Sequence, residues 1–297
     1  MTPLQNKIDF AVILRVKNAN PNGDPLNGNR PRTDYSNFGE MTDVSLKRKI
    51  RDRLLERYVT LIENGQPNDG QAIFVQSDDR KIDDAKNLRE RAEKALGSKL
   101  GSSETYGLAC KTWIDVRTFG QLFALKSNKK AGKKKEDGSD DEGDTGVSIG
   151  IRGPVTVQSA FSVEPIDITS TQITKSVSGE GDGTNRGSDT MGMKHRVDHG
   201  VYVFYGSMNP QLAERTFFSD EDAEAIKQVL PKLFENDESS ARPAGSMEVL
   251  KVVWWKHNCK SGQHSSVKVH RTLAVNADGS FELANLPDLV PEKLDGF

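Results

Sequence analysis

The stretch from Thr42 to Glu63 most constrains the fold, because it reads as one amphipathic helix. Thr42 or Asp43 can cap its first turn by accepting hydrogen bonds from free backbone amides. Gly65 follows the last apolar position, where helices commonly end in a left-handed glycine. Apolar residues recur at three- and four-residue spacing and predict a stripe that faces a core, formed by Leu46, Ile50, Leu54, Tyr58 and Leu61.

Cations surround this stripe and are densest in the first turns: Lys47, Arg48, Lys49, Arg51, Arg53 and Arg57. Cations, free amides and the positive end of a helix dipole together attract phosphate. The alternative is a solvated basic face on an ordinary core helix. The net charge of the chain is −2, so any surface that binds nucleic acid must be local.

Alternation of apolar and polar residues predicts a first strand at 7–17, with one apolar face and a second face that ends in basic residues. Similar patterns predict three further strand regions, at 147–168, 196–208 and 246–257. A second helix, capped by Ser219, is predicted at 218–236. Without insertions the order is β-α-β-β-α-β, the α+β arrangement of ferredoxin-like and RNA-recognition-motif folds. Such a sheet packs helices on one face and can present the other to single-stranded RNA.

Three segments depart from this framework. Residues 66–146 read as an insertion, with a charged helix at 83–97 and a polar Lys/Asp-rich loop at 127–146. Residues 169–195 combine β-prone flanks with a Gly-rich middle, which predicts a long β-ribbon with a flexible tip. Residues 18–41 are rich in Asn, Gly and Pro, so we expect an irregular binding loop.

The loop at 18–41 offers donors to phosphate or base edges, from Asn20, Asn22, Arg30 and Arg32. Its acids allow a second interpretation, a metal-binding carboxylate set made of Asp24, Asp34 and Asp43. Aspartate is also a routine turn and cap residue, so these positions are open to both interpretations.

The predicted ribbon carries a second group of cations, Lys175, Lys194 and Arg196, with Met193 as an apolar wedge for bases. His195 could instead act as general acid or base in a metal-independent ribonuclease that processes RNA. No G-x-S-x-G, H-E-x-x-H, Walker or zinc spacing accompanies it. A protein-binding hairpin without nucleic acid is the third interpretation of this segment.

Cysteine usage and hydropathy point to a soluble protein of the cytoplasm. Cys110 and Cys259 lie far apart and outside any metal-binding spacing, which favours free thiols in a reducing compartment. No signal peptide pattern begins the sequence, and no apolar run reaches the ~20 residues that span a bilayer. We therefore expect no membrane partner.

Certain short stretches occur in a specific order: NPNGDP (20–25), TDVSLKRKIRD (42–52), DVRTFG (115–120), GPVTVQSAFS (153–162) and TMGMKHRVDHGVY (190–202). Each is weak alone, but together they are specific. In them the sequence resembles the backbone-subunit family of type I-C CRISPR Cascade, part of the seventh Cas family within the wider RAMP group.

The resemblance implies a hand-shaped subunit. Its RNA-recognition-like palm would span 1–65, 147–168 and 196–297, its fingers insertion 66–146, and its thumb ribbon 169–195. It implies a non-catalytic antiviral-defence protein that polymerises head to tail along the crRNA. The guide backbone would be bound independently of sequence and kinked by the thumb, leaving bases to pair with target DNA. The handle-binding, large and small Cascade subunits are implied partners, and no cofactor or metal is implied.

Carried onto this chain, the resemblance assigns phosphate binding at the first helix to Thr42, Ser45, Lys47 and Arg51, and the wedge beside a displaced base to Met193. The full set of residues expected to contact RNA is Lys17, Asn20, Asn22, Thr42, Ser45, Lys47, Arg48, Arg51, Gln158, Lys175, Met193, Lys194, His195 and Arg196.

Overall fold

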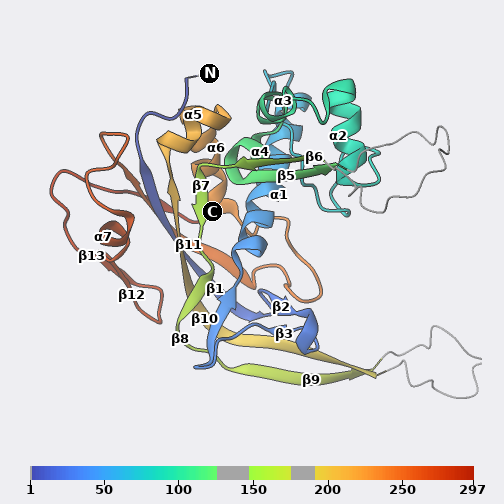
Figure 1. Cartoon of the computed structure of the whole chain (residues 1–297). Helices are drawn as coiled ribbons and strands as arrows, with labels where there is room; N and C mark the ends of the chain where they lie inside the picture. Colours follow the sequence, from blue (N-terminus) through green and yellow to red (C-terminus); the bar gives the residue numbers. More distant parts are fainter. Residues whose placement is uncertain (1, 126–146, 175–190) are drawn as a thin grey trace, which may run out of the picture.

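A computed structural model describes residues 2–125, 147–174 and 191–297. Within these residues an antiparallel sheet of eight strands runs through the centre of the molecule (Figure 1). Its main path contains, in spatial order, β14 (Glu292–Asp295), β11 (Met247–Lys256), β1 (Ile8–Ala19), β10 (Met191–Met208), β8 (Ala160–Pro165) and β4 (Phe38–Met41). Two further strands, β7 (Val155–Val157) and β9 (Ile168–Thr174), pair with β10.

The order of the main elements along the chain follows the prediction. After β1 come the helix α1 (Asp43–Glu63), strands β8 and β10, the helix α6 (Asp220–Val229) and strand β11. The expected α+β class, with a central antiparallel sheet, is confirmed, and this order is compatible with a ferredoxin-like unit. Among the described residues, no helix combines the length and apolarity that crossing a bilayer requires.

Helix α1 has the predicted ends, and three of the five predicted stripe residues are buried, whereas Tyr58 and Leu61 are partly exposed. Thr42 caps it, its hydroxyl accepting from the Ser45 amide at 3.3 Å, and Gly65 adopts a left-handed φ of 62° just beyond it. Leu46, Ile50 and Leu54 are buried in the core between α1, α6 and the sheet. Alternate residues of β1 supply the sheet side of this core, namely Ile8, Phe10, Val12, Leu14 and Val16.

The opposite face of the sheet is covered, which corrects the expectation of a face open to RNA. Ala11 and Ile13 of β1 pack with Val253 and Trp255 of β11 against the C-terminal part of the chain. That layer contains α7 (Ser266–His270), β12 (Leu273–Val275) and β13 (Phe281–Leu283) (Figure 1). The run VVWW in β11 is buried on both faces, and such continuous apolar runs are typical of doubly covered strands.

A buried carboxylate joins this layer to the start of β1. Asp9 is fully buried, 3.0 Å from His257 Nε2 and 3.1 Å from Lys7 Nζ. Burial raises the pKa of Asp9, but hydrogen bonds from His257, Ser266 and Lys7 outweigh it and hold the pKa below its usual value. Asp9 therefore remains ionised at neutral pH and fixes the C-terminal layer through polar contacts.

Residues 66–125 and 147–152 build a second, smaller core. It surrounds Phe74, Trp113 and Phe123, and its elements are α2 (Leu88–Leu96), η2 (Gly97–Lys99), α3 (Thr105–Thr112), α4 (Ile114–Phe119), β5 (Gly120–Leu125) and β6 (Val147–Arg152). Helix α2 begins later than the expected residue 83, because Asn87 caps it and Asp83 pairs instead with Arg91. The division into palm, fingers and thumb stays a prediction, and loop residues 127–146 lie outside the described residues.

The segment 18–41 is more regular than expected. It contains β2 (Gly23–Asp24), η1 (Pro25–Asn27), β3 (Arg30–Pro31) and β4, the last of which joins the main sheet. Met41 of β4 is buried opposite Ala160 of β8, so this apolar residue anchors the end of the polar stretch in the core. The remaining short elements are α5 (Pro210–Thr216) and η4 (Leu230–Lys232).

A buried ion pair connects α4 to α6, and thus the smaller core to the main one. Arg117 donates from Nε and Nη2 to Asp222 at 2.8 and 2.6 Å, and each side chain is 1% exposed. Asp222 also accepts from the Ser219 amide at 3.0 Å in the predicted cap of α6. Buried carboxylates are costly to leave without their partners.

We expect Arg117→Met to lower the free energy of unfolding by about 3–5 kcal/mol, because it leaves Asp222 ionised and uncompensated. Urea denaturation followed by circular dichroism measures the loss. Arg117→Met combined with Asp222→Asn should recover part of it, since asparagine keeps the cap acceptor without the charge. An unchanged urea midpoint in the single variant would contradict this role.

Candidate nucleic-acid interface

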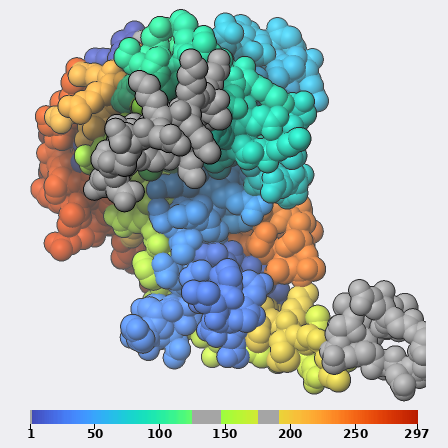
Figure 2. Space-filling model, turned by 45° about the vertical axis from the view of Figure 1, so that its right-hand side comes forward, coloured from blue at the N-terminus to red at the C-terminus, as the bar shows by residue number. Residues whose placement is uncertain are grey.

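The β9–β10 ribbon projects beyond the main sheet (Figures 1 and 2). Its strands pair from Ile168 opposite Val197 to Thr174 opposite Met191. The side chains of Met191 and Met193 are 61% and 55% exposed. Lys175 and the rest of the predicted tip, 175–190, lie outside the described residues. The ribbon therefore offers apolar surface where bases could stack.

A cavity of about 260 Å³ lies along one side of this ribbon. Three separate segments meet there: the loop after β1, the ribbon, and residues 240–241. We call it the ribbon cavity, and its lining consists of Asn20, Gly28, Asn29, Ile173, Met193, Lys194, His195, Ser240 and Ala241. It brings together four residues that the sequence predicted as RNA contacts: Asn20, Met193, Lys194 and His195.

Two hydrogen bonds hold Asn20 in the lining of the ribbon cavity. Its Nδ2 donates to the Asn29 carbonyl at 2.7 Å, and its backbone amide donates to the Ala241 carbonyl at 2.8 Å. The side-chain oxygen has no hydrogen-bond partner among the described residues, although Asn20 is only 4% exposed. A buried acceptor without a donor is costly, so this oxygen suits a ligand hydroxyl or amino group.

His195 belongs to a small polar network across the ribbon. Ser170 Oγ lies 2.8 Å from His195 Nδ1 and accepts from Arg30 Nη2 at 2.8 Å. Ser170 Oγ accepts from Arg30 and still has one donor and one acceptor site, so it can pair with either neutral tautomer of His195. Ser170 did not stand out in the sequence, since a lone serine in a Thr- and Ser-rich flank carries no distinguishing signal.

The first turn of α1 is more self-contained than the sequence suggests. Asn22 Oδ1 accepts from the backbone amide and hydroxyl of Thr42 at 2.9 and 3.1 Å. Lys47 pairs with Asp43 at 2.8 Å, and both remain partly exposed. Thr42, Ser45 and Asn22 thus form one cap, beside a cation that already has an acidic partner. Phosphate binding here stays a prediction.

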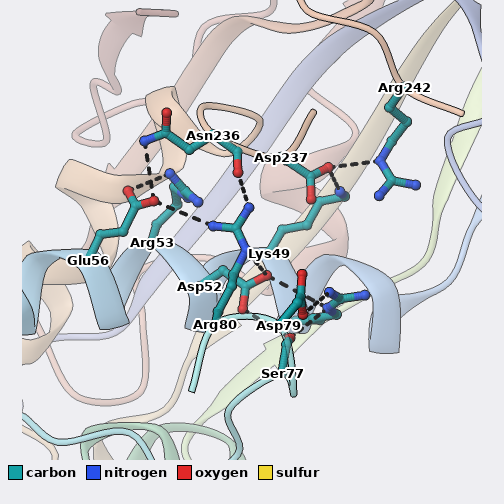
Figure 3. Close-up of polar contacts among 11 residues, drawn as sticks. Lys49, Asp52, Arg53, Glu56, Ser77, Asp79, Arg80, Asn236, Asp237 and Arg242 are labelled. Carbon is teal, nitrogen blue, oxygen red and sulfur yellow. Dashed lines mark hydrogen bonds and ion pairs between the residues drawn. The ribbon is translucent and has the colours of Figure 1, made fainter. Parts of the chain in front are cut away.

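Farther along α1, the cations point toward other parts of the protein rather than to the ribbon. Arg51 is paired with buried Asp115 at 3.2 Å and lies over the Phe119 ring, with its side chain 14% exposed. Arg48 donates to Ser77 at 2.9 Å. Lys49 is buried against Asp237, and burial lowers the pKa of Lys49 to about 8 although Asp237 opposes this (Figure 3). These side chains hold neighbouring segments together.

The other predicted contacts are dispersed. Lys17 is exposed near the end of β1, opposite His199 in the sheet register, and Gln158 is exposed between β7 and β8. Arg196 is exposed on β10 and pairs with Asp198 at 3.2 Å. Of these, Arg196 alone follows directly on the residues of the ribbon cavity.

The three aspartates proposed as an alternative metal set have separate structural roles. Asp24 caps η1 and lies 3.4 Å from Arg32, Asp34 accepts the amides of Ser36 and Phe38, and Asp43 pairs with Lys47. Within the ranges that the structure describes, no three His, Cys, Asp or Glu side chains gather as metal ligands. The geometry therefore gives the metal interpretation no support.

Comparison with known proteins identifies the family. Residues 6–289 match the family model described as CRISPR-associated protein Cas7. The chain belongs to the Cas7 family. It is 25% identical over 296 residues to the CRISPR-associated protein Cas7 of Haloferax volcanii, an alignment that covers 98% of this chain and 81% of that relative.

Two solved structures are also similar to this Cas7-family chain. One is described as a CRISPR RNA-guided surveillance complex, pre-nicking, with a TM-score of 0.45 and 15% identity over 84% of this chain and 78% of that chain. The other, a CRISPR RNA-guided surveillance complex, has a TM-score of 0.44 and 16% identity over 92% and 77% of the two chains.

For this Cas7-family chain, we expect Arg51→Ala to lower the free energy of unfolding by about 1–3 kcal/mol, because buried Asp115 loses its cation. Lys47→Ala, on the same helix but partly exposed, should change it by less than about 0.5 kcal/mol. Urea denaturation of the two variants side by side measures both. Equal stability of Arg51→Ala and the unaltered protein would show that Arg51 is free for a ligand.

Proposed function

We propose that this chain is the non-catalytic backbone subunit of a type I-C CRISPR surveillance complex and binds crRNA along its ribbon. The observation that carries the proposal is the ribbon cavity, where Asn20 from the loop after β1 meets Lys194 and His195 of β10 in a Cas7-family chain. Cation, acceptor and exposed apolar surface are the elements that a single-stranded nucleic acid requires.

The chemistry of the cavity favours contacts to the RNA backbone. Lys194 and Arg196 supply positive charge for phosphates, and Arg30 is fixed beside His195 through Ser170. The unpaired oxygen of Asn20 can accept from a ribose 2′-hydroxyl, a group that distinguishes RNA from DNA. None of these contacts reads a base, so binding is independent of the guide sequence.

Met193 provides the ribbon with an apolar wedge beside the cavity. Its side chain is 55% exposed although it lines the cavity, so it can contact both the backbone site and a neighbouring base. A base displaced by this wedge interrupts the stack locally and kinks the guide. The bases between successive kinks stay available for pairing with the target DNA strand.

A projecting ribbon also suits assembly. It can reach over a neighbouring copy, and a head-to-tail contact of this kind builds an open filament rather than a closed ring. In the proposed complex, copies of this chain line the crRNA, and the handle-binding, large and small Cascade subunits complete the assembly.

We expect Lys194→Gln with Arg196→Gln to weaken binding of every guide sequence to a similar degree. The slope of log K against log salt should fall by about 1.4, because each phosphate contact on a single strand contributes about 0.7. Fluorescence anisotropy with several RNA oligonucleotides measures both quantities. The matched control replaces two exposed lysines outside the ribbon, Lys256→Gln with Lys260→Gln. A loss confined to particular sequences would contradict backbone recognition.

The alternative function is an RNA-processing endonuclease with His195 as its acid or base. The histidine is partly buried and lines the cavity, which is the specific observation in its favour. Its Nδ1 is engaged by Ser170, however, and the adjacent donors Arg30 and Lys194 suit retention of phosphate.

We therefore expect purified protein to leave CRISPR repeat RNA intact, with or without Mg²⁺, on a denaturing gel. His195→Ala should change binding but produce no difference in RNA length. Cleavage that is lost in His195→Ala would establish the endonuclease instead. Mg²⁺-dependent cleavage of a complementary RNA that is lost in Asp34→Ala would equally overturn the non-catalytic assignment.

A further inference from the structure

A second cavity, of about 540 Å³, lies on the C-terminal half of α1, away from the ribbon. Helix α1 forms one wall, and the end of α6 with the segment that follows it forms the other. We call it the Arg53 cavity, and its lining includes Arg53, Glu56, Arg57, Lys232, Asn236 and Phe297.

Arg53 is the unusual member of this lining. Its side chain is 3% exposed, and Nη1 donates to Glu56. Its Nε and Nη2 are buried and have no hydrogen-bond partner in the part of the chain that the structure describes. Figure 3 shows the guanidinium beside Glu56 and Asn236, two other residues of the same lining.

The two unpaired atoms form the edge of a guanidinium that binds oxyanions in a bidentate manner. The same chain uses this edge elsewhere. Arg117 donates from Nε and Nη2 to Asp222 at 2.8 and 2.6 Å. Arg91 donates from the same two atoms to Asp83 at 2.7 and 2.9 Å. In Arg53 this edge has no carboxylate among the described residues.

Nearby charges favour one small anion over a polyanion. Glu56 is already shared among Arg53, Arg80 and Asn236, the last two at 3.4 and 3.3 Å. Lys232 lies over the Phe297 ring at 4.3 Å, at the exposed rim. Arg57 is held by Gln71 at 3.0 Å. Three cations, Arg53, Arg57 and Lys232, thus face two glutamates, Glu56 and Glu235. This small excess of positive charge suits a single oxyanion better than a continuous phosphate backbone.

We propose that the Arg53 cavity binds one oxyanion, a carboxylate or phosphate group, through the Nε and Nη2 edge of Arg53. The site is separate from the ribbon cavity and does not depend on RNA binding. Lys232 at the rim attracts the anion, and the buried Arg53 edge fixes its orientation through two parallel hydrogen bonds.

The test observes the Arg53 Nε–H group directly, in a proton–nitrogen correlation spectrum of the full-length protein. Sodium phosphate and sodium acetate are titrated separately, with sodium chloride keeping the ionic strength constant. The Arg53 Nε proton should shift downfield and saturate with at least one of them. No shift with either would mean that the edge is hydrated, and would overturn the proposal. A shift with phosphate alone or acetate alone identifies the group that the site accepts.

Two variants serve as controls. Arg53→Lys removes the Arg53 Nε–H signal and so identifies it. This variant should weaken anion binding by at least about tenfold, because lysine keeps the charge but loses the fork. The Asn236 amide signal reports binding in this variant. If that variant does not fold, Lys232→Gln at the rim should weaken binding by roughly threefold, with Lys260→Gln as the matched exposed control. Equal affinities in Lys232→Gln and Lys260→Gln would contradict the assigned rim.

A further experiment distinguishes this site from the proposed RNA interface. Addition of a short single-stranded RNA should leave the Arg53 Nε–H signal unchanged. A shift with RNA that competes with phosphate would place the Arg53 cavity in the nucleic-acid interface and overturn the proposal of a separate site. The variant Lys194→Gln, which alters the ribbon, should retain normal anion binding at Arg53.

Discussion

The burial of β1 on both faces is the constraint on which the rest of the structure depends. Its odd and even residues face different layers, with Phe10 and Val12 toward the helices and Ala11 and Ile13 toward the C-terminal segment. Strands β10 and β11 pair with it on either side, so neither its edges nor its faces are free. A sheet covered in this way offers no open flat face at β1 on which bases could stack. The proposed RNA contacts therefore lie on projections from the sheet.

Strand β10 links the core to that projection. From Val197 onward its residues are mostly buried beside β1, whereas from Met191 to Lys194 they are exposed in the ribbon. One continuous strand therefore anchors the site and displays it, which fixes the position of Lys194 and His195 relative to the core. The loop after β1 reaches the same place through Asn20, whose side chain donates to the Asn29 carbonyl and whose backbone amide donates to the Ala241 carbonyl. These two bonds help to set the cavity, although residues 20 and 241 are far apart in sequence.

Local periodicity predicted the parts of this structure that local chemistry determines. The stripe of α1, its cap at Thr42 and the cap of α6 at Ser219 all depend on residues within one or two turns of each other. The direction in which each cation points does not depend on such nearby residues. Arg51 and Lys49 lie on a visibly basic helix, but their acids, Asp115 and Asp237, come from distant segments. A pattern of spacing cannot distinguish a cation that faces solvent from one that faces a buried carboxylate.

This difference changes what the basic helix can do. A cation that already neutralises a buried acid attracts phosphate weakly, because moving it toward the ligand would leave the acid uncompensated. Arg48, Lys49 and Arg51 of α1 are committed in this way, which is why the proposed RNA contacts are placed on the ribbon, with exposed Lys194 and Arg196. The same reasoning makes Arg53 conspicuous. The preceding cations Lys49 and Arg51 are matched by acids. The Nε and Nη2 edge of Arg53 is buried without one, and burial gives any oxyanion that reaches it little competition from water.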